Sequence, residues 1–237
     1  MKKTGRPGVG EIAFRWRSFL PLLAAVGLML GLFEKQAEPA NSIRLWIGSG
    51  LALAGLGLTL RLYGVGHAPP GTSGRHRRQH AALLNTFGIY SIVRHPLYLG
   101  NVLIWIGISL TSGWRVGAAA SSVAAAVMFG AIVRHEDAYL ARRFGSDFEE
   151  WAAVTPAFVP RPGLWRTARR PFRWALAVAS EYSTLHSIGL LALLFAAVRR
   201  WVGEGALPGL GWWALLSANS VLYLAIRAWR SRTRSSR

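Results

Sequence analysis

The chain has 237 residues, of which 52% are hydrophobic and only 16% are charged. Soluble domains carry roughly 25% charged residues, so this composition, with a mean hydropathy of +0.28, favours a membrane protein. The net charge of +18 excludes an acidic disordered chain. The absence of cysteine excludes a disulfide scaffold, a zinc ribbon and a thiol nucleophile.

Six apolar segments predict an all-α, polytopic integral-membrane bundle of about six transmembrane helices. A full span needs about 20 apolar residues, so the shorter segments must borrow flanking residues whose polar ends reach the interface. The segments are 19–33, 45–60, 97–112, 116–133, 185–198 and 209–226. The first follows a basic start and could instead be a signal peptide, although no convincing cleavage site follows it.

Basic residues flank these segments and predict an orientation with both termini in the cytoplasm. All but five of the 28 lysines and arginines then fall on the inner side, as the positive-inside rule requires. The exceptions are Lys35, Arg44, Arg115, Arg199 and Arg200. We expect the basic residues to meet anionic lipid head groups and not nucleic acid. The arginine-rich, lysine-poor composition suggests a GC-rich bacterial genome, and therefore a bacterial inner membrane.

Two long inner loops, 62–96 and 134–184, hold most of the chain outside the spans. Long ordered connections often carry function, so we expect a cytoplasmic cofactor pocket formed by the loops around the third and fourth spans. The chain then divides into a two-helix region with a basic loop, a core, and an interfacial segment with two further helices. Their predicted bounds are 1–81, 82–162 and 163–237.

The third span begins with the run RHPLY at 94–98. Pro96 suits the first residue of a helix, because its missing N–H costs nothing there. The free N–H groups of that helix, with Arg94 and His95 beside them, suit an anionic group, and Gly100 would let another backbone come close. The alternative is structural: an interfacial Arg-His pair before a helix-starting proline.

An acidic pair follows the fourth span at Glu136 and Asp137. Glu136 lies one turn before an apolar helical stripe at 140–151. A carboxylate on the inward face of a helix at the membrane edge is costly unless it is paired, and its expected partners are the arginines of the basic loop, of which Arg94 lies nearest the membrane. The alternative is an ion pair that only closes the bundle.

The chain lacks a nucleophile turn, a phosphate loop and a dinucleotide fingerprint. Its six histidines are scattered, so we predict no metal site. A basic, aromatic, carboxylate-lined pocket suits a zwitterionic cofactor, and a methyl donor with a sulfonium centre fits. Arg94 would meet its carboxylate, Glu136 or Asp137 its amine or ribose, and aromatic faces its cation.

The run GIYSIVRHPLYLGN, followed by EDAYLARRFGSDFEEW and TPAFVPRP, resembles the isoprenylcysteine carboxyl methyltransferase family and its phospholipid N-methyltransferase relatives. These are integral-membrane enzymes that use S-adenosylmethionine. Four family marks occur in order within 82–162, a third of the chain: Arg-His-Pro-x-Tyr, an acidic pair, Phe-Gly and a closing Thr-Pro…Pro. The resemblance implies S-adenosylmethionine as cofactor and a lipid or isoprenoid-like acceptor.

The resemblance also implies roles for single residues. Glu136 matches the first acid of the family's pair, and Asp137 replaces the second glutamate. Arg94 and Glu136 are expected to be catalytic, and Arg134 lies near the family's substrate-side arginine. With Gly100 at the helix start, the predicted cofactor-binding residues are Leu83, Leu84, Tyr90, His95, Pro96, Leu97, Tyr98, Gly100, Glu136 and Asp137.

We expect the enzyme to accelerate methyl transfer by holding the acceptor, the methyl carbon and the sulfur in line and by excluding water. A carboxylate or phosphate acceptor is already ionised at pH 7 and needs no general base, whereas an amine acceptor would need proton removal, with Glu136 as the candidate base. Two alternatives remain open. One is an NADPH-dependent membrane reductase on a related bundle, and the other is a non-catalytic membrane protein in which Arg94 and Glu136 only close the bundle.

Overall fold

The computed structural model describes residues 12–13, 20–33, 40–69 and 83–235, and these confirm the all-α class. Strand-like pairing in the described residues is limited to one isolated bridge between Gly88 and Arg166. Two short 3₁₀ turns are η1 (Ile89–Ser91) and η2 (Pro162–Leu164). The α-helices given for these described residues are α2 (Leu20–Gly31), α3 (Ala40–Gly66), α4 (Pro96–Thr111), α5 (Arg115–Phe144), α6 (Ser146–Val154), α7 (Trp174–Glu204) and α8 (Leu210–Ser235).

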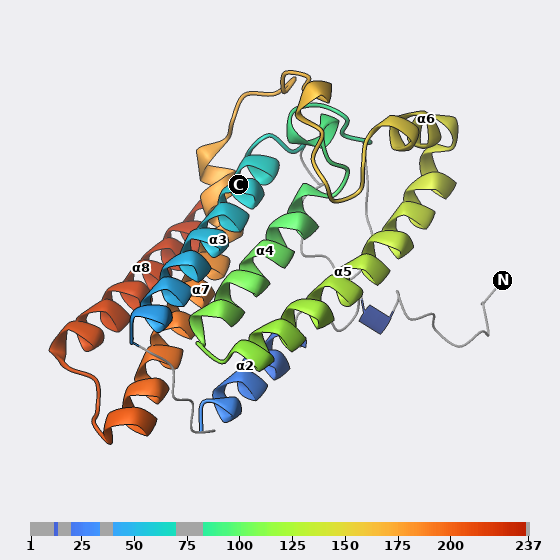
Figure 1. The fold of residues 1–237 in the computed structure, drawn as a ribbon. Coiled ribbons are helices and arrows are strands. Elements are labelled where there is room, and N and C mark those ends of the chain that lie inside the picture. Colours follow the sequence, from blue (N-terminus) through green and yellow to red (C-terminus); the bar gives the residue numbers. More distant parts are fainter. Residues whose placement is uncertain (1–11, 14–19, 34–39, 70–82, 236–237) are drawn as a thin grey trace.

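The long helices form one bundle, as Figure 1 shows. Helices α3, α4 and α5 lie side by side, α7 and α8 pair with each other beside α3, and α2 lies at one end of α4 and α5. The short helix α6 and the connection that follows it gather at the opposite end, where α4 begins. That end of the bundle therefore brings together the two loops in which the sequence predicts the site.

The six predicted apolar segments overlap six of these helices in the same order: α2, α3, α4, α5, α7 and α8. Three helices are long and apolar enough to cross a membrane, namely Ser42–Gly66 within α3, α5 and α7, whereas α4 is apolar but shorter. These helices support an integral-membrane protein. A total of six spans, and the side on which the termini lie, stay predictions.

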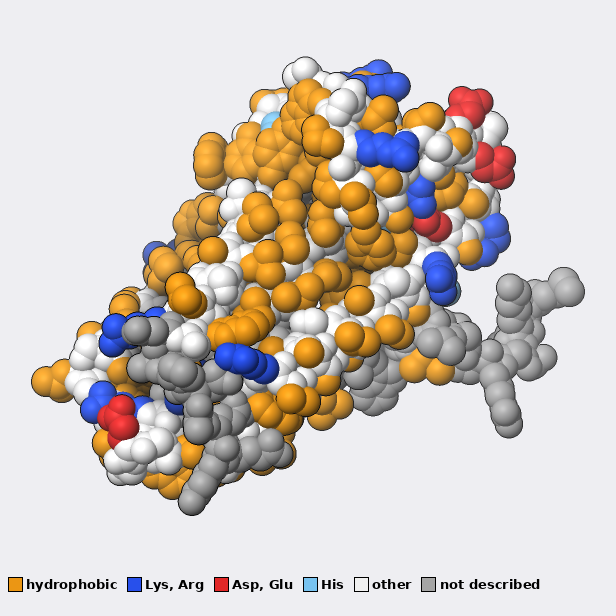
Figure 2. All heavy atoms as spheres, viewed as in Figure 1, with side chains coloured by type: hydrophobic (Ala, Val, Ile, Leu, Met, Phe, Trp, Pro, Cys, Tyr) orange, Lys and Arg blue, Asp and Glu red, His pale blue; other side chains and the backbone are white. Residues whose placement is uncertain are grey.

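Some predicted features lie outside the described residues. These include the basic N-terminal residues, the basic run 75–80 and the proposed boundary at residue 81. On the face in Figure 2, hydrophobic side chains cover most of the bundle, and charged side chains lie mainly toward its ends. Exposed apolar residues such as Leu45 (75% exposed) and Val127 (68% exposed) are what a lipid-facing surface requires.

Helices α3 and α4 pack closely through glycines. A Cβ at Gly57 would lie 2.5 Å from the Gly100 carbonyl oxygen, and a Cβ at Gly107 would lie 2.5 Å from that of Gly50. Small residues let helix backbones approach closely in membranes. A Cβ at Gly100 would also meet Arg61 Cγ at 2.6 Å. The open side of Gly100 is therefore filled by α3, and its predicted role in cofactor binding stays a prediction.

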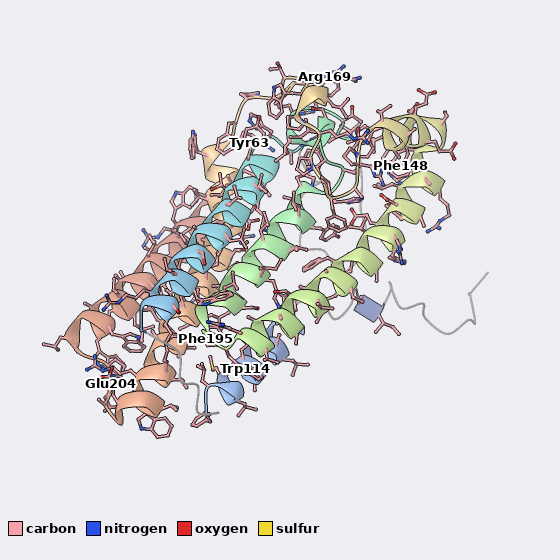
Figure 3. The ribbon with its side chains drawn as sticks, viewed as in Figure 1. Tyr63, Trp114, Phe148, Arg169, Phe195 and Glu204 are labelled. Carbon is pink, nitrogen blue, oxygen red and sulfur yellow. The ribbon has the colours of Figure 1, made fainter. Side chains whose placement is uncertain are left out.

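The interior of the bundle holds two apolar clusters. In one, Phe195 of α7 is fully buried against residues of α2, α3 and α4 (Figure 3). In the other, Phe129 and Ile132 of α5 pack against Tyr98 and Trp105 of α4. This second cluster fixes α4 against α5 directly below the predicted site.

The contacts of Arg199 explain why this basic residue lies on the predicted outer side, against the positive-inside rule. Its Nη1 donates to the carbonyl oxygens of Thr111, at 3.2 Å, and Ser112, at 2.7 Å. These carbonyls lie at the C-terminal end of α4, where a basic side chain satisfies orphan acceptors and complements the helix dipole. Arg199 therefore binds protein at the end opposite the predicted site.

Candidate active site at the junction of α4 and α5

Helix α4 starts at Pro96 with His95 as its N-cap residue, which confirms the predicted helix start. The His95 carbonyl accepts the first helical hydrogen bond, from the Leu99 N–H at 2.9 Å. The imidazole makes no capping bond and is free to turn toward α5. Pro96 and the His95 side chain are buried, so the start of α4 is packed inside the protein.

The closing Thr-Pro…Pro segment, 155–162, runs beside the residues that precede α4. The Arg94 N–H donates to the Pro156 carbonyl at 2.8 Å, and the Arg161 N–H donates to the Ile92 carbonyl at 2.9 Å. Proline cannot continue a helix, and α6 ends at Val154, two residues before Pro156. The chain can then fold back, which brings two motifs 60 residues apart in the sequence into contact.

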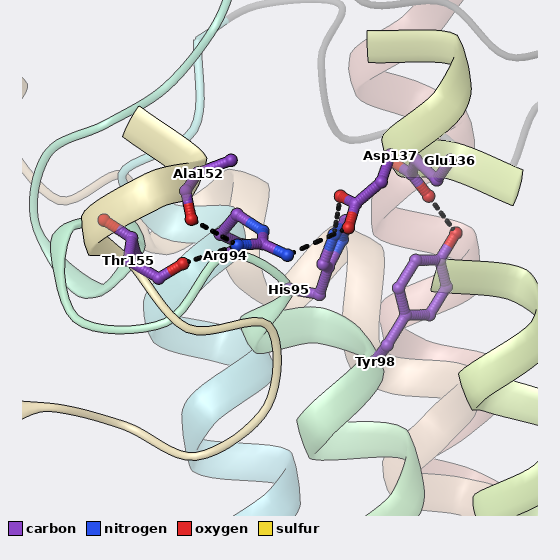
Figure 4. Close-up of polar contacts among 7 residues, drawn as sticks. All are labelled: Arg94, His95, Tyr98, Glu136, Asp137, Ala152 and Thr155. Atoms are coloured by element: carbon purple, nitrogen blue, oxygen red, sulfur yellow. Dashed lines mark hydrogen bonds and ion pairs between the residues drawn. The ribbon is translucent and has the colours of Figure 1, made fainter. Parts of the chain in front are cut away.

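The Arg94 guanidinium joins three elements (Figure 4). Its Nη1 donates to the carbonyl oxygens of Ala152, at 2.8 Å, and Thr155, at 2.7 Å, and its Nη2 binds Asp137 Oδ2 at 3.0 Å. Its Nε is buried and has no hydrogen-bond partner among the described residues. An orphaned buried donor is unusual, and it is available to an anionic group.

Asp137 is the carboxylate that pairs with both residues before Pro96. Its Oδ1 lies 2.7 Å from His95 Nε2, and its Oδ2 accepts from Arg94 (Figure 4). The expected Arg94–Glu136 pair is therefore wrong. Successive residues of an α-helix point about 100° apart, so Asp137 faces the chain before α4 while Glu136 faces the first turn of α4.

Glu136 has a different environment. Tyr98 donates its hydroxyl to Glu136 Oε2 at 2.5 Å (Figure 4). No other hydrogen bond to Glu136 comes from the described residues, so one carboxylate oxygen remains available. The Tyr98 ring lies between those of His95, with centroids 5.8 Å apart, and Phe129, at 6.0 Å. Within the described residues, Glu136 is therefore held through one carboxylate oxygen only.

Tyr90, in η1, lies within electrostatic reach of this carboxylate. Burial raises the pKa of Tyr90 above its ordinary value, the Glu136 charge raises that pKa further, and Arg61 opposes both. The phenol therefore stays neutral at pH 7. The Trp151 indole of α6 donates to the Tyr90 carbonyl at 3.2 Å, which fixes η1 against α6.

The structure brings most of the predicted residues together at this end of α4 and α5, including Tyr90, Arg94, His95, Tyr98 and the acidic pair. Leu83 is 55% exposed and Arg134 is exposed, and neither joins the hydrogen-bond network. Their roles, and that of half-buried Leu84, stay predictions. The cofactor pocket also stays a prediction; a shallow surface depression between α7 and α8, lined by Tyr182, His186 and Asn219 among others, does not lie at this site.

The sequence reasoning placed neither Arg61 nor Glu181 among the site residues, yet they form an ion pair beside the first turn of α4. Arg61 Nη2 lies 2.7 Å from Glu181 Oε1, and Arg61 Nη1 donates to Asn101 Oδ1 at 2.6 Å. At the end of an apolar span, Arg61 has the pattern of an arginine that reaches the interface. The available signal was Glu181, because an acidic residue at the start of an apolar segment requires a partner.

Comparisons with known proteins agree with the motifs. Residues 43–147 match the family described as Phospholipid methyltransferase. The chain is 32% identical over 145 residues to Protein-S-isoprenylcysteine O-methyltransferase B of Arabidopsis thaliana, a match that covers 57% of this chain and 73% of that protein. The chain belongs to the isoprenylcysteine and phospholipid methyltransferase family. This membership confirms the resemblance and places the protein in a family of membrane methyltransferases.

Two further relatives carry metal-resistance names. The chain is 37% identical over 123 residues to Nickel-cobalt-cadmium resistance protein NccN of Alcaligenes xylosoxydans xylosoxydans, covering 52% of this chain and 55% of that protein. It is 39% identical over 116 residues to Cobalt-zinc-cadmium resistance protein CzcN of Cupriavidus metallidurans, covering 46% and 51%. The chain thus matches about half the length of each. No solved structure matches it.

Proposed function

We propose that this protein is an S-adenosylmethionine-dependent membrane methyltransferase that acts on a lipid-linked or isoprenoid acceptor. The observation that carries the proposal is that two groups suited to a ligand lie near the start of α4, one on the residue before His95 and one on α5. Within the described residues, Arg94 Nε is a buried donor with no partner, and only one oxygen of Glu136 accepts a hydrogen bond. Family membership supports the same conclusion.

The residues fit the cofactor chemically. Its carboxylate suits the Arg94 Nε–H and the positive end of the α4 helix dipole, and its ammonium suits Glu136. The neutral rings of Tyr90 and Tyr98 suit its positive charge. When bound, S-adenosylmethionine supplies a methyl group on a sulfonium centre, which leaves as a neutral thioether.

The protein's own side chains would contribute by orienting the cofactor and the acceptor. Asp137 keeps Arg94 and His95 oriented through its two oxygens. A carboxylate or phosphate acceptor is already ionised at pH 7, so the site need only orient the reactants and exclude water. For an amine acceptor, the free oxygen of Glu136 would take the proton. We favour the carboxylate because the relatives named above include Protein-S-isoprenylcysteine O-methyltransferase B of Arabidopsis thaliana.

The acceptor's apolar part would lie among the apolar helices, with its polar end at the start of α4. Exposed arginines on this end of the protein, among them Arg134, Arg142 and Arg143, would hold anionic lipid head groups at the cytoplasmic surface. The proposal includes no metal: among the described residues no group of three or more His, Asp or Glu side chains could hold an ion.

The test is transfer of a labelled methyl group from S-adenosylmethionine to a bacterial membrane lipid extract by the purified protein. We expect label in the lipid fraction with the wild type, loss of transfer in His95→Ala and Glu136→Gln, and normal transfer in Glu150→Gln, which changes an exposed carboxylate of α6. Alkali releases the label from a carboxylate ester but not from an N-methyl group. Absence of transfer by folded protein that binds NADPH instead would support the reductase.

A further inference from the structure

We propose that Arg61 and Glu181 form a positioning clamp that sets the first turn of α4 and thereby the groups it carries; the functional part of this inference rests on the proposed function. Arg61 Nε donates to Glu181 Oε2 at 2.8 Å, and Nη2 donates to Oε1 at 2.7 Å. The two side chains are 11% and 3% exposed. This bidentate pair joins α3 to α7 inside the bundle.

The same guanidinium holds α4. Arg61 Nη1 donates to Asn101 Oδ1 at 2.6 Å and to the Leu97 carbonyl at 3.3 Å. The stem of Arg61 lies against Gly100, where a Cβ would meet its Cγ at 2.6 Å. Arg61 therefore contacts one turn of α4 at three residues, through a side-chain amide, a backbone carbonyl and a glycine that leaves it room.

Stability alone does not account for this pair. Replacing a buried ion pair by apolar residues is often neutral or stabilising, because taking charges out of water is costly. Thr184 also donates to Glu181 Oε2 at 2.8 Å, so both Glu181 oxygens are engaged and the carboxylate is fixed. The arrangement is rigid and directional, which is the requirement for holding one helix in register.

The clamped turn is the one that carries the site. Tyr98 follows Leu97 directly and bonds Glu136, and His95, two residues before Leu97, bonds Asp137. A turn of α4 that shifts away from α3 would move Tyr98 and His95 relative to α5. Misplacement of supporting groups by about 1 Å is enough to cost catalysis or binding heavily, so we assign Arg61 and Glu181 as positioning residues.

The chain offers a matched control on the same helix. Arg199 of α7 binds carbonyls at the other end of α4, about 27 Å along α7 from Glu181 at 1.5 Å per residue. Arg199→Gln therefore weakens another part-buried arginine contact that links α7 to α4, but far from the site. A general loss of helix packing would affect both variants alike, whereas loss of positioning would affect only Glu181→Gln.

The first readout is backbone amide hydrogen exchange of full-length protein in detergent, which needs no cofactor. We expect Glu181→Gln to speed exchange about tenfold over residues 99–103, the effect of losing one charge-assisted hydrogen bond, with little change near the end of α4. Arg199→Gln should speed exchange near the end of α4 and leave residues 99–103 little changed. Equal acceleration at both ends in Glu181→Gln would overturn the clamp.

The second readout is the Kd for S-adenosylmethionine, measured well below the unfolding temperature of each variant. We expect an increase of about tenfold in Glu181→Gln and less than about twofold in Arg199→Gln; equal weakening in both would overturn the positioning role. If Glu181→Gln does not fold, Asn101→Ala, which removes the α4 acceptor and keeps the ion pair, takes its place. Should the wild type bind no S-adenosylmethionine, the proposed function fails while hydrogen exchange still decides the clamp.

Discussion

Glu136 and Asp137 are adjacent carboxylates with different tasks. Asp137 accepts from Arg94 and His95 with both oxygens, so it is committed to holding the chain before α4. Glu136 accepts only from Tyr98 among the described residues, and so can receive a ligand. The family's acidic pair therefore divides, in this chain, into one supporting residue and one residue that faces the site.

This division predicts that one conservative substitution mainly lowers stability and that the other mainly weakens cofactor binding. Asp137→Asn removes the counterion of a half-buried guanidinium and should cost about 1.5–3 kcal/mol of unfolding free energy. Glu136→Gln keeps an acceptor for Tyr98 and should cost less than about 1 kcal/mol, yet weaken S-adenosylmethionine binding. Thermal unfolding and binding of both variants check this, and a larger stability loss in Glu136→Gln would contradict it.

Tyr90 predicts a stability effect at alkaline pH. Its pKa is raised in the folded protein, so above about pH 10, where tyrosines of the unfolded chain ionise, the native state keeps one proton more. Stability present below that pH is then lost as pH rises, by up to about 1.4 kcal/mol per unit. Between about pH 9 and about pH 11, the unfolding free energy of Tyr90→Phe should fall less than that of the wild type. An equal fall in both proteins would argue against a raised Tyr90 pKa.

At this scale the sequence predicted which residues gather but not how they pair. Arg94, His95, Tyr98, Glu136 and Asp137 were all named from local motifs. The choice between Glu136 and Asp137 as the partner of Arg94 depends on the rotation of α5 about its axis. That rotation is set by tertiary packing of Phe129 and Ile132, which the motif does not contain.

At the scale of single elements, the α3–α4 contact depends on glycine. Gly57→Ala would place a Cβ 2.5 Å from a backbone oxygen of α4, and such overpacking costs about 1–3 kcal/mol. Gly55→Ala is the matched control, two residues away on the same helix with nothing within 4 Å. Thermal unfolding should show a loss only for Gly57→Ala. Similar unfolding temperatures for the two variants would contradict close α3–α4 packing.

The boundary between α5 and α6 could not be predicted from the spacing of apolar residues. The apolar stripe at 140–151 predicts one helical face, but α5 ends at Phe144 and α6 begins at Ser146. Gly145 lies between them with φ +54°, a conformation that glycine adopts without a Cβ penalty. The turn redirects α6 so that the segment after Val154 reaches Arg94. Periodicity alone does not reveal a break that preserves the apolar spacing.

Across the whole molecule, hydropathy predicted the helices and their order, whereas the contacts of α7 at both ends of α4 could not be predicted. Glu181 acts through Arg61 at the start of α4, and Arg199 binds its end. The partners in these contacts are separated by 87 or more residues in the sequence. No local motif encodes them, because each side chain alone resembles an interfacial charge.

The predicted orientation can be tested because the chain has no cysteine. Ser146→Cys, at the exposed start of α6, and Leu207→Cys, 75% exposed between α7 and α8, give single thiols at opposite ends of the bundle. A membrane-impermeant thiol reagent on intact cells should label Leu207→Cys and not Ser146→Cys, since basic loops stay inside. The reverse pattern would overturn the assigned cytoplasmic face.

The most direct test of the account is equilibrium binding of S-adenosylmethionine to the detergent-purified protein. We predict saturable binding to the wild type and to Glu150→Gln, and binding weakened at least about tenfold in Glu136→Gln, with the far-ultraviolet circular dichroism of all three unchanged. Well-folded wild type that does not bind S-adenosylmethionine in detergent or in lipid would contradict the account.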